Sequence, residues 1–248
     1  MAAMKQTSTD RPSRRAVAVA FGIAIAAAAA LIAVALISKR GSDTPPPTAT
    51  PVVDLGGIPQ DGSVLGNPDA QVLMIEYADQ QCPACRLYTE EFFPTLVNEY
   101  VRPGKVNVEF RGFPFIGDDS VKAYRYLLAA AEQDKLWNLQ EALYRNQGGE
   151  NSGWVTDDLV RRVAGEIPGL DVDELFADAS DPAIQQEADG ASEAASNAGI
   201  TGTPTFLLQI GDQQPYMVSF GSLDQMRAAL DDAPVSYTHL TLPTIYSV

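Results

Sequence analysis

The sequence predicts one α/β domain, in which strands near both ends enclose a block of helices. Apolar or alternating runs typical of strands occur at residues 72–77, 106–113, 205–210 and 216–220. A five-residue turn separates the last two runs, as in an antiparallel hairpin. Between the second and third runs, apolar residues recur at helical spacing. The order is therefore strand, helix, strand, helical block, strand, strand and helix.

Helix signals divide the segments between these strands. We expect a helix from about residue 83 to residue 100, kinked at Pro94. A long helical stretch follows over residues 120–145. Further helices are expected behind four capping residues, and Gly199 is suited to end the third of them. They cover residues 157–165 after Thr156, a short helical turn to about residue 179 after Asp171, residues 182–198 after Asp181, and residues 223–230 after Ser222.

The N-terminal region reads as a membrane anchor and a spacer. Residues 16–37 carry no charge, and about 22 helical residues span about 33 Å, enough to cross a bilayer core of about 30 Å. The basic residues before this segment favour a cytoplasmic N-terminus at residues 1–15. No small-x-small cleavage site follows it, so we expect an uncleaved anchor. The Pro/Thr-rich residues 38–55 then form a semi-stiff spacer.

The C-terminal residues 235–248 differ in composition from the acidic body. Back-translated, they resemble a transposon-end sequencing adapter read in frame, so we treat this tail as non-native and exclude it from the domain at residues 56–234. A native but unusual tail is the alternative. The only histidine, His239, lies in this tail.

Composition excludes several classes of function. The formal net charge of −15 repels nucleic-acid phosphates. One His and two Cys cannot form a four-ligand zinc site or an iron–sulfur cluster, so we expect no metal site. Without His239 the chain also lacks the base of a cysteine protease or serine hydrolase.

Both cysteines of the chain lie in one motif, Cys82-Pro83-Ala84-Cys85, between a predicted strand and a predicted helix. A helix start supplies unpaired N–H groups and a partial positive charge, and both stabilise a thiolate. Pro83 suits the first helical position. We expect Cys82 in the first turn and more exposed, with Cys85 shielded one turn further in.

Three other roles for this pair remain open. A structural disulfide would close too short a loop to gain much entropy. A metal would need ligands from a second chain. Unpaired packing cysteines are unexpected in an oxidising compartment. A redox-active dithiol or disulfide is therefore the favoured interpretation.

Four further motifs accompany the cysteines in a fixed order. They are residues 66–70 (GNPDA), the EYAD stretch at 76–79 with FRGFP at 110–114, and GTPTF at 202–206. With these motifs, residues 62–230 resemble the membrane-anchored bacterial DsbA-like thiol:disulfide oxidoreductases of the thioredoxin-fold superfamily. The resemblance implies a thioredoxin fold, a central mixed β-sheet flanked by helices, with residues 118–199 as an inserted helical subdomain.

The resemblance also implies roles for individual residues. Thr203 and Pro204 match a loop with a cis proline that faces the dithiol and binds the substrate backbone. Glu76 matches an acid beneath the active site that relays a proton to or from Cys85; the alternative is a salt-bridged or strand-edge acid. Ala84 stands where the best-known member has a histidine, a difference that should raise the pKa of Cys82 and weaken the oxidant.

We therefore expect an enzyme that exchanges disulfides with exported proteins, in the oxidising direction. The resemblance implies reoxidation by a quinone-linked membrane partner of the DsbB or vitamin-K-epoxide-reductase-like type, and no cofactor beyond the Cys82–Cys85 pair. The catalytic domain is expected outside the cytoplasm, on a single-pass anchor, as a monomer. A disulfide reductase or isomerase is one alternative, and a non-enzymatic protein that delivers copper or holds unfolded clients is another.

Overall fold

The computed structural model describes the backbone of residues 53–240 and the side chains of residues 53–233. The expected membrane anchor at residues 16–37 lies outside the described residues, as does nearly all of the spacer. Within the part that is described, no helix is both long enough and apolar enough to cross a bilayer.

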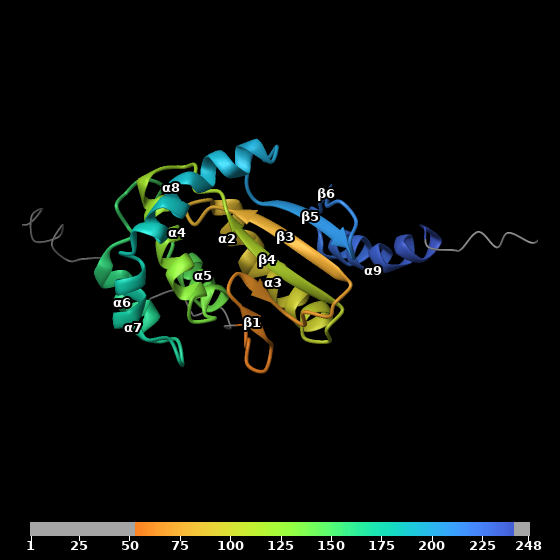
Figure 1. Ribbon diagram of the computed structural model, residues 1–248, viewed down its shortest axis with the longest axis horizontal. Coiled ribbons are helices and arrows are strands. Elements are labelled where there is room, and N and C mark those ends of the chain that lie inside the picture. Colours follow the sequence, from red (N-terminus) through yellow and green to blue (C-terminus); the bar gives the residue numbers. More distant parts are fainter. Residues whose placement is uncertain (1–52, 241–248) are drawn as a thin grey trace, which may run out of the picture. The chain divides into compact units, whose positions relative to one another are not determined.

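A mixed β-sheet forms the centre of the fold, as the sequence predicts (Figure 1). Its middle strand β3 (Val72–Ala78) runs parallel to β4 (Val106–Gly112) and antiparallel to β5 (Thr205–Ile210). Strand β6 (Tyr216–Val218) pairs antiparallel with β5 and completes the expected hairpin. Within the described residues the strand order is β1-β2-β4-β3-β5-β6.

A small hairpin at the other edge of the sheet is absent from the sequence prediction. Strands β1 (Gln60–Asp61) and β2 (Val64–Leu65) pair with each other, and β2 continues the sheet antiparallel to β4. Two-residue strands are too short to show an alternating pattern, so nothing in the sequence signals them.

Burial on both faces of β3 fixes how the helices pack around it. Alternation along a strand sends neighbouring side chains to opposite faces. Met74 and Ala78 join the large core that includes both cysteines. Ile75 and Tyr77 join a second, smaller cluster on the other face.

The helix after the cysteines is broken more severely than the expected kink. It consists of α2 (Pro83–Glu91), α3 (Phe93–Leu96) and the π-helical turn η1 (Val97–Val101). Pro94 lies in the first turn of α3. A proline there lacks the N–H that would continue α2, and its ring clashes with the preceding turn, so the helix stops and restarts.

The helical block contains a break that the sequence analysis did not predict. Residues 120–145 form two helices, α4 (Asp118–Ala131) and α5 (Leu136–Arg145), and not one. The turn between them holds Asp134 at a φ of 56°. A left-handed residue ends a helix, and short polar side chains such as Asp tolerate this conformation best.

The remaining helices begin at the predicted caps. Helices α6 (Asp157–Ala164), α7 (Val172–Asp178) and α8 (Pro182–Asn197) start behind Thr156, Asp171 and Asp181, whose side chains accept backbone N–H groups. Gly199 follows α8 at a φ of 81°, which suits a helix end. In Figure 1, α4 to α7 gather at one end of the sheet, and α9 lies at the other.

The last helix, α9 (Leu223–Leu240), runs past its predicted end near residue 230. Ser222 precedes it as predicted, and its hydroxyl accepts the Gln225 N–H at 3.3 Å. The helix therefore enters the segment that we treated as a foreign tail. The origin of that tail stays a prediction.

Candidate active site

The two cysteines stand where β3 passes into α2. A three-residue loop follows the end of β3, and Cys82 then serves as the N-cap of α2, one position before the expected first turn. Pro83 occupies the first helical position, as predicted. Both Pro83 and Ala84 are exposed, so the surface beside the dithiol is formed by two small apolar residues.

The Cys82 sulfur points at the start of its own helix. Its Sγ accepts the backbone N–H of Cys85 at 3.4 Å. The pKa of Cys82 is lowered to about 6, chiefly because the Cys85 thiol can donate to its thiolate. The Thr203 side chain and the backbone N–H groups of Ala84 and Cys85 lower it further, while burial opposes them. This is the environment of a thiolate at a helix N-terminus.

Cys85 lies one turn further in and is fully buried. Burial raises the pKa of its thiol well above the ordinary value, and the neighbouring Cys82 raises it further. The sequence prediction is correct about the order, but Cys82 is only 7% exposed and so less open than expected. The two cysteines are free thiols in this structure.

The loop before β5 faces the dithiol. The Thr203–Pro204 peptide bond is cis. The Cys82 thiol lies 3.4 Å from the carbonyl oxygen of Thr203, in position to donate to it. The structure thus brings together Cys82 and the loop that the resemblance assigned to substrate, although 121 residues separate them along the chain.

Glu76 is fully buried in the middle of the central strand β3. Burial raises the pKa of its carboxyl to about 8, and the nearby Gln140 amide lowers it slightly. Neither carboxyl oxygen makes a hydrogen bond that satisfies normal geometry. No ion pair to it is found among residues 53–233, so the salt-bridged and strand-edge alternatives are both wrong.

Tyr88 lies in the same buried region as Glu76 and Cys85. Its ring packs against Phe206 at a centroid distance of 4.6 Å, and Phe206 is the neighbour of Glu76 on β5. Burial raises the pKa of Tyr88 well above its ordinary value, and the charges of Glu76 and Cys85 both add to this rise. Glu76 and Cys85 therefore lie in one buried, poorly solvated region.

The loop before Cys82 is held by a network that the sequence did not reveal. The Asp79 carboxylate accepts the Ser120 hydroxyl at 2.6 Å and the backbone N–H groups of Gln81 and Ile116. The Gln81 amide donates in turn to Ser120. Asp79 was visible only as part of the EYAD motif, and its partners are too distant in sequence to be predicted from spacing.

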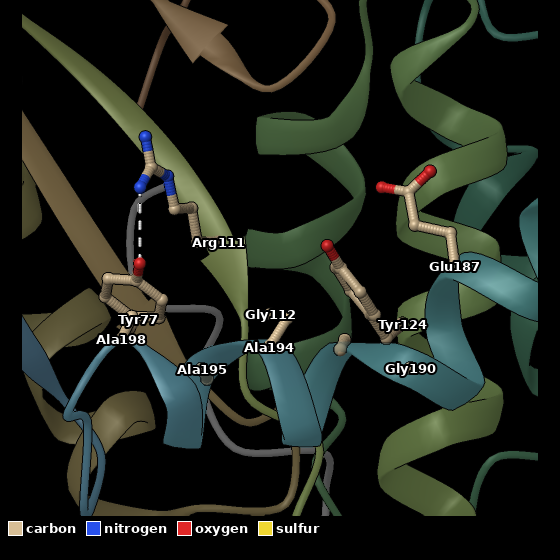
Figure 2. A pocket seen from close by; sticks show the side chains of 10 residues that line it. Tyr77, Arg111, Gly112, Tyr124, Glu187, Gly190, Ala194, Ala195 and Ala198 are labelled. Atoms are coloured by element: carbon tan, nitrogen blue, oxygen red, sulfur yellow. Dashed lines mark hydrogen bonds between the residues drawn. The ribbon is translucent and has the colours of Figure 1, made fainter.

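A separate hollow of about 400 Å³ lies between α8 and the ends of β3 and β4 (Figure 2). Arg111 donates to the Tyr77 hydroxyl at 3.2 Å on one side of it, and Glu187 stands on the other. Arg111 is also paired with Glu109 at 2.7 Å. None of the predicted site residues lines this hollow, so it is distinct from the dithiol site.

No group of three or more His, Cys, Asp or Glu side chains in the described part of the chain is arranged to hold a metal ion. The reactive groups that the structure places at the site are the two sulfurs. A low-pKa sulfur beside a shielded, high-pKa sulfur can form and break disulfides with a passing thiol.

Comparison with known proteins agrees with this geometry. A protein-family model described as Thioredoxin matches residues 60–232. The chain is 32% identical over 170 residues to a probable disulfide bond formation protein D of Bacillus cereus, covering 67% of this chain and 76% of the relative. It is 24% identical over 174 residues to disulfide bond formation protein D of Bacillus subtilis, covering 68% and 75%.

Solved structures support the fold. Oxidised BdbD from Bacillus subtilis superposes with a TM-score of 0.61 at 21% identity, over 71% of this chain and 96% of that chain. The α-DsbA1 of Wolbachia pipientis gives a TM-score of 0.62 at 24% identity, over 76% and 97%. With fold, site and relatives in agreement, the chain belongs to the thioredoxin family, as a DsbA-like thiol:disulfide oxidoreductase.

Proposed function

We propose that this protein oxidises the thiols of exported proteins through the Cys82–Cys85 pair. The observation that carries the proposal is the asymmetry of the pair, with the pKa of Cys82 lowered to about 6 and that of Cys85 raised. A sulfur with a low pKa is a good leaving group, and a good leaving group favours release of an oxidised product.

The reaction begins with the pair as a disulfide. A substrate thiolate attacks the Cys82 sulfur, a new S–S bond forms to the substrate, and Cys85 leaves as a thiolate. A second substrate thiolate then attacks the substrate sulfur of this mixed disulfide, and Cys82 leaves as a thiolate. The substrate gains a disulfide and loses two electrons, which remain on the reduced pair.

Glu76 serves the Cys85 side of this cycle. Its carboxyl pKa of about 8 keeps it largely protonated at neutral pH. It can therefore give a proton to the Cys85 thiolate as that sulfur leaves, and take it back when the pair is reoxidised. Without such a proton, a buried thiolate would be costly.

Thr203 and Pro204 bind the substrate. The Thr203 carbonyl faces the Cys82 sulfur at 3.4 Å. A peptide that lies along this loop in an extended form places its own cysteine next to Cys82. The loop therefore positions the two sulfurs for the exchange.

Location and partners complete the proposal. The segment at residues 16–37 anchors the chain, and the catalytic domain works outside the cytoplasm as a monomer. The reduced pair passes its electrons to a quinone-linked membrane partner of the DsbB or vitamin-K-epoxide-reductase-like type. The dithiol itself is the only redox group required.

A reductase or isomerase is the second candidate, favoured by Ala84. No charge at position 84 stabilises the Cys82 thiolate, which makes the disulfide a weaker oxidant. A redox titration against glutathione separates the two. A potential near −120 mV, about that of DsbA, supports oxidation, and one near −270 mV, about that of thioredoxin, supports reduction.

Refolding of a reduced two-disulfide protein with catalytic amounts of the full chain, with oxidised glutathione as the terminal oxidant, tests the proposal directly. The wild type should accelerate disulfide formation, Cys82→Ser should not, and Cys85→Ser should accumulate a mixed disulfide visible on a non-reducing gel. Equal activity of Cys82→Ser and wild type would overturn the proposal. Stoichiometric Cu(I) binding without any catalysed oxidation would replace it with a copper-delivery protein.

A further inference from the structure

Tyr144, near the end of α5, and Gln147, just after it, donate hydrogen bonds to the loop that carries Cys82. We propose that Gln147 is a positioning residue for the disulfide exchange, because it fixes Cys82 at the start of α2 with its sulfur directed at the helix N–H groups. The inference rests on the proposed function in one respect, that Cys82 is the sulfur attacked by substrate.

Gln147 reaches two carbonyl groups of the active-site loop with one nitrogen. Its Nε2 donates to the Gln80 carbonyl at 2.7 Å and to the Cys82 carbonyl at 3.2 Å. Both amide hydrogens are therefore used. The Cys82 carbonyl also accepts the N–H of Arg86 at 3.2 Å, the first hydrogen bond of α2, so Gln147 ties the loop and the helix start together.

Tyr144 supports the same loop one step further from the sulfur. Its hydroxyl donates to the Asp79 carbonyl at 3.2 Å, and that carbonyl also accepts the Cys82 N–H at 3.0 Å. Together, Tyr144 and Gln147 supply a side-chain donor to three loop carbonyls, those of Asp79, Gln80 and Cys82. Each of these contacts spans 65 or more residues of sequence.

The orientation of the Cys82 residue decides how well its sulfur is stabilised. The Sγ accepts the Cys85 N–H at 3.4 Å, an ordinary distance for a hydrogen bond to sulfur. A small rotation of the Cys82 peptide would lengthen it. Loss of the Gln147 donors removes the restraint on that peptide, and it also removes positive amide hydrogens from the vicinity of the thiolate.

The experiment follows the ionisation of the Cys82 thiol in the reduced full chain by absorbance at 240 nm. Gln147→Met keeps the length of the side chain but removes its donors. We expect the titration midpoint to rise by about half a unit to one unit, the size of a lost N-cap contact. The other ionisable groups around the sulfur, Cys85, Tyr144, Glu76 and Asp79, are unchanged in this variant.

Two further variants test whether the size of the shift depends on contact with the loop. Tyr144→Phe removes the more distant donor and should raise the midpoint by less than Gln147→Met. Asn146→Leu is the matched control, because the Asn146 amide donates to the Ala142 carbonyl at 2.8 Å and accepts from Arg162 at 3.3 Å, and among the described residues its side chain has no hydrogen bond to the active-site loop. It should lower thermal stability without moving the midpoint.

A Gln147→Met midpoint equal to that of wild type would overturn the inference, as would an equal shift in Asn146→Leu. If Gln147→Met does not fold, Gln147→Asn decides, because it keeps the amide but shortens its reach and must show the same rise. The titration needs no substrate. If Gln147→Met shifts the titration midpoint but the wild type catalyses no oxidation, the proposed function is rejected. If the wild type catalyses oxidation but Gln147→Met does not shift the midpoint, only this role of Gln147 is rejected.

Discussion

The dithiol has an outward side, at Cys82, and an inward side, at Cys85. The two sides differ in their surroundings and in the pKa of the thiol. Cys82 lies on the outward side, at the helix start, with backbone N–H groups and the Thr203 loop around it. Cys85 lies on the inward side with Glu76 and Tyr88, and all three are buried. Three residues along one helix thus separate a sulfur whose pKa is lowered to about 6 from one whose pKa is raised.

Burial alone does not explain this difference, because Cys82 is itself only 7% exposed. What differs is the number of donors that can stabilise a negative charge. The pKa of Cys82 is lowered by the Cys85 thiol, the Thr203 side chain and two backbone N–H groups, whereas for Cys85 the Asp79 backbone and the Thr203 side chain are outweighed by burial and by Cys82. The fold therefore stabilises one sulfur as an anion when it leaves and favours protonation of the other as it leaves.

The largest expected effect concerns the inward side. Glu76→Gln removes a carboxyl whose pKa rises from an ordinary value of 4.5 to about 8 on folding. The folded wild type keeps the proton that the unfolded chain has lost, so Glu76 costs stability increasingly as the pH rises from 4.5 towards 8. The gap in unfolding free energy between variant and wild type should therefore widen by about 3 kcal/mol from pH 4.5 to pH 7.

Urea unfolding of the reduced proteins at several pH values measures this gap. The lowered pKa of Cys82 adds stability as the pH rises through 6, but it does so in both proteins and cancels in the difference. A gap that stays constant with pH would show that folding does not raise the pKa of Glu76. The inward side would then not hold a protonated acid at neutral pH.

The next largest effect is a difference between the two sulfurs in their rate of alkylation. At pH 7 a thiol of pKa about 6 is about nine-tenths thiolate, whereas one of pKa above 9 is about 1% thiolate or less. The lower intrinsic nucleophilicity of the more acidic thiolate offsets about twentyfold of this for a pKa difference of about three. Limited iodoacetamide should therefore modify Cys82 at least about fourfold faster than Cys85, as read by peptide mass spectrometry.

Unfolding in urea provides the control, since both thiols then have ordinary pKa values and should react alike. Equal rates in the folded protein would contradict the assignment of roles. Faster modification of Cys85 would reverse it.

The sequence predicted the outward side better than the inward side. The cysteines and the helix start at Pro83 follow from local patterns, and the loop at Thr203 and Pro204 follows from the family resemblance. The cis bond itself followed from resemblance, because an X-Pro bond is cis in only about 5% of cases. Thr156, Asp171 and Asp181 were also found, because a cap depends only on its own next few residues.

What could not be predicted depends on contacts between distant segments. Tyr144 and Gln147 read as ordinary residues of a helix end, and only the folded chain brings them to the active-site loop. The burial of Glu76 on both sides follows from its pairing with β4 and β5. The break before α5 was missed because the apolar spacing of residues 120–145 continues across it, while Asp134 gives little local signal.

The smallest expected effect concerns the outward side, where a substitution at Ala84 should change the pKa of Cys82. Ala84→His places an imidazole in the exposed first turn of α2, beside the Cys82 thiolate. A protonated imidazole should lower the pKa of Cys82 by about half a unit and make the disulfide a slightly stronger oxidant, by about 15 mV. Because imidazole has an ordinary pKa of about 6.5, the effect should be largest below that pH and fade above it.

Leu87→His is the matched control, because Leu87 is 50% exposed on the same helix but one turn further from Cys82. Its effect on the Cys82 titration at 240 nm should be smaller than that of Ala84→His. If the two variants shift the midpoint equally, the outward side responds to net charge and not to position, since a long-range field would act on the sulfur from either turn. A larger shift for Ala84→His means that the first turn of α2 is where the acidity of Cys82 is set, and that an uncharged residue there keeps the oxidant mild.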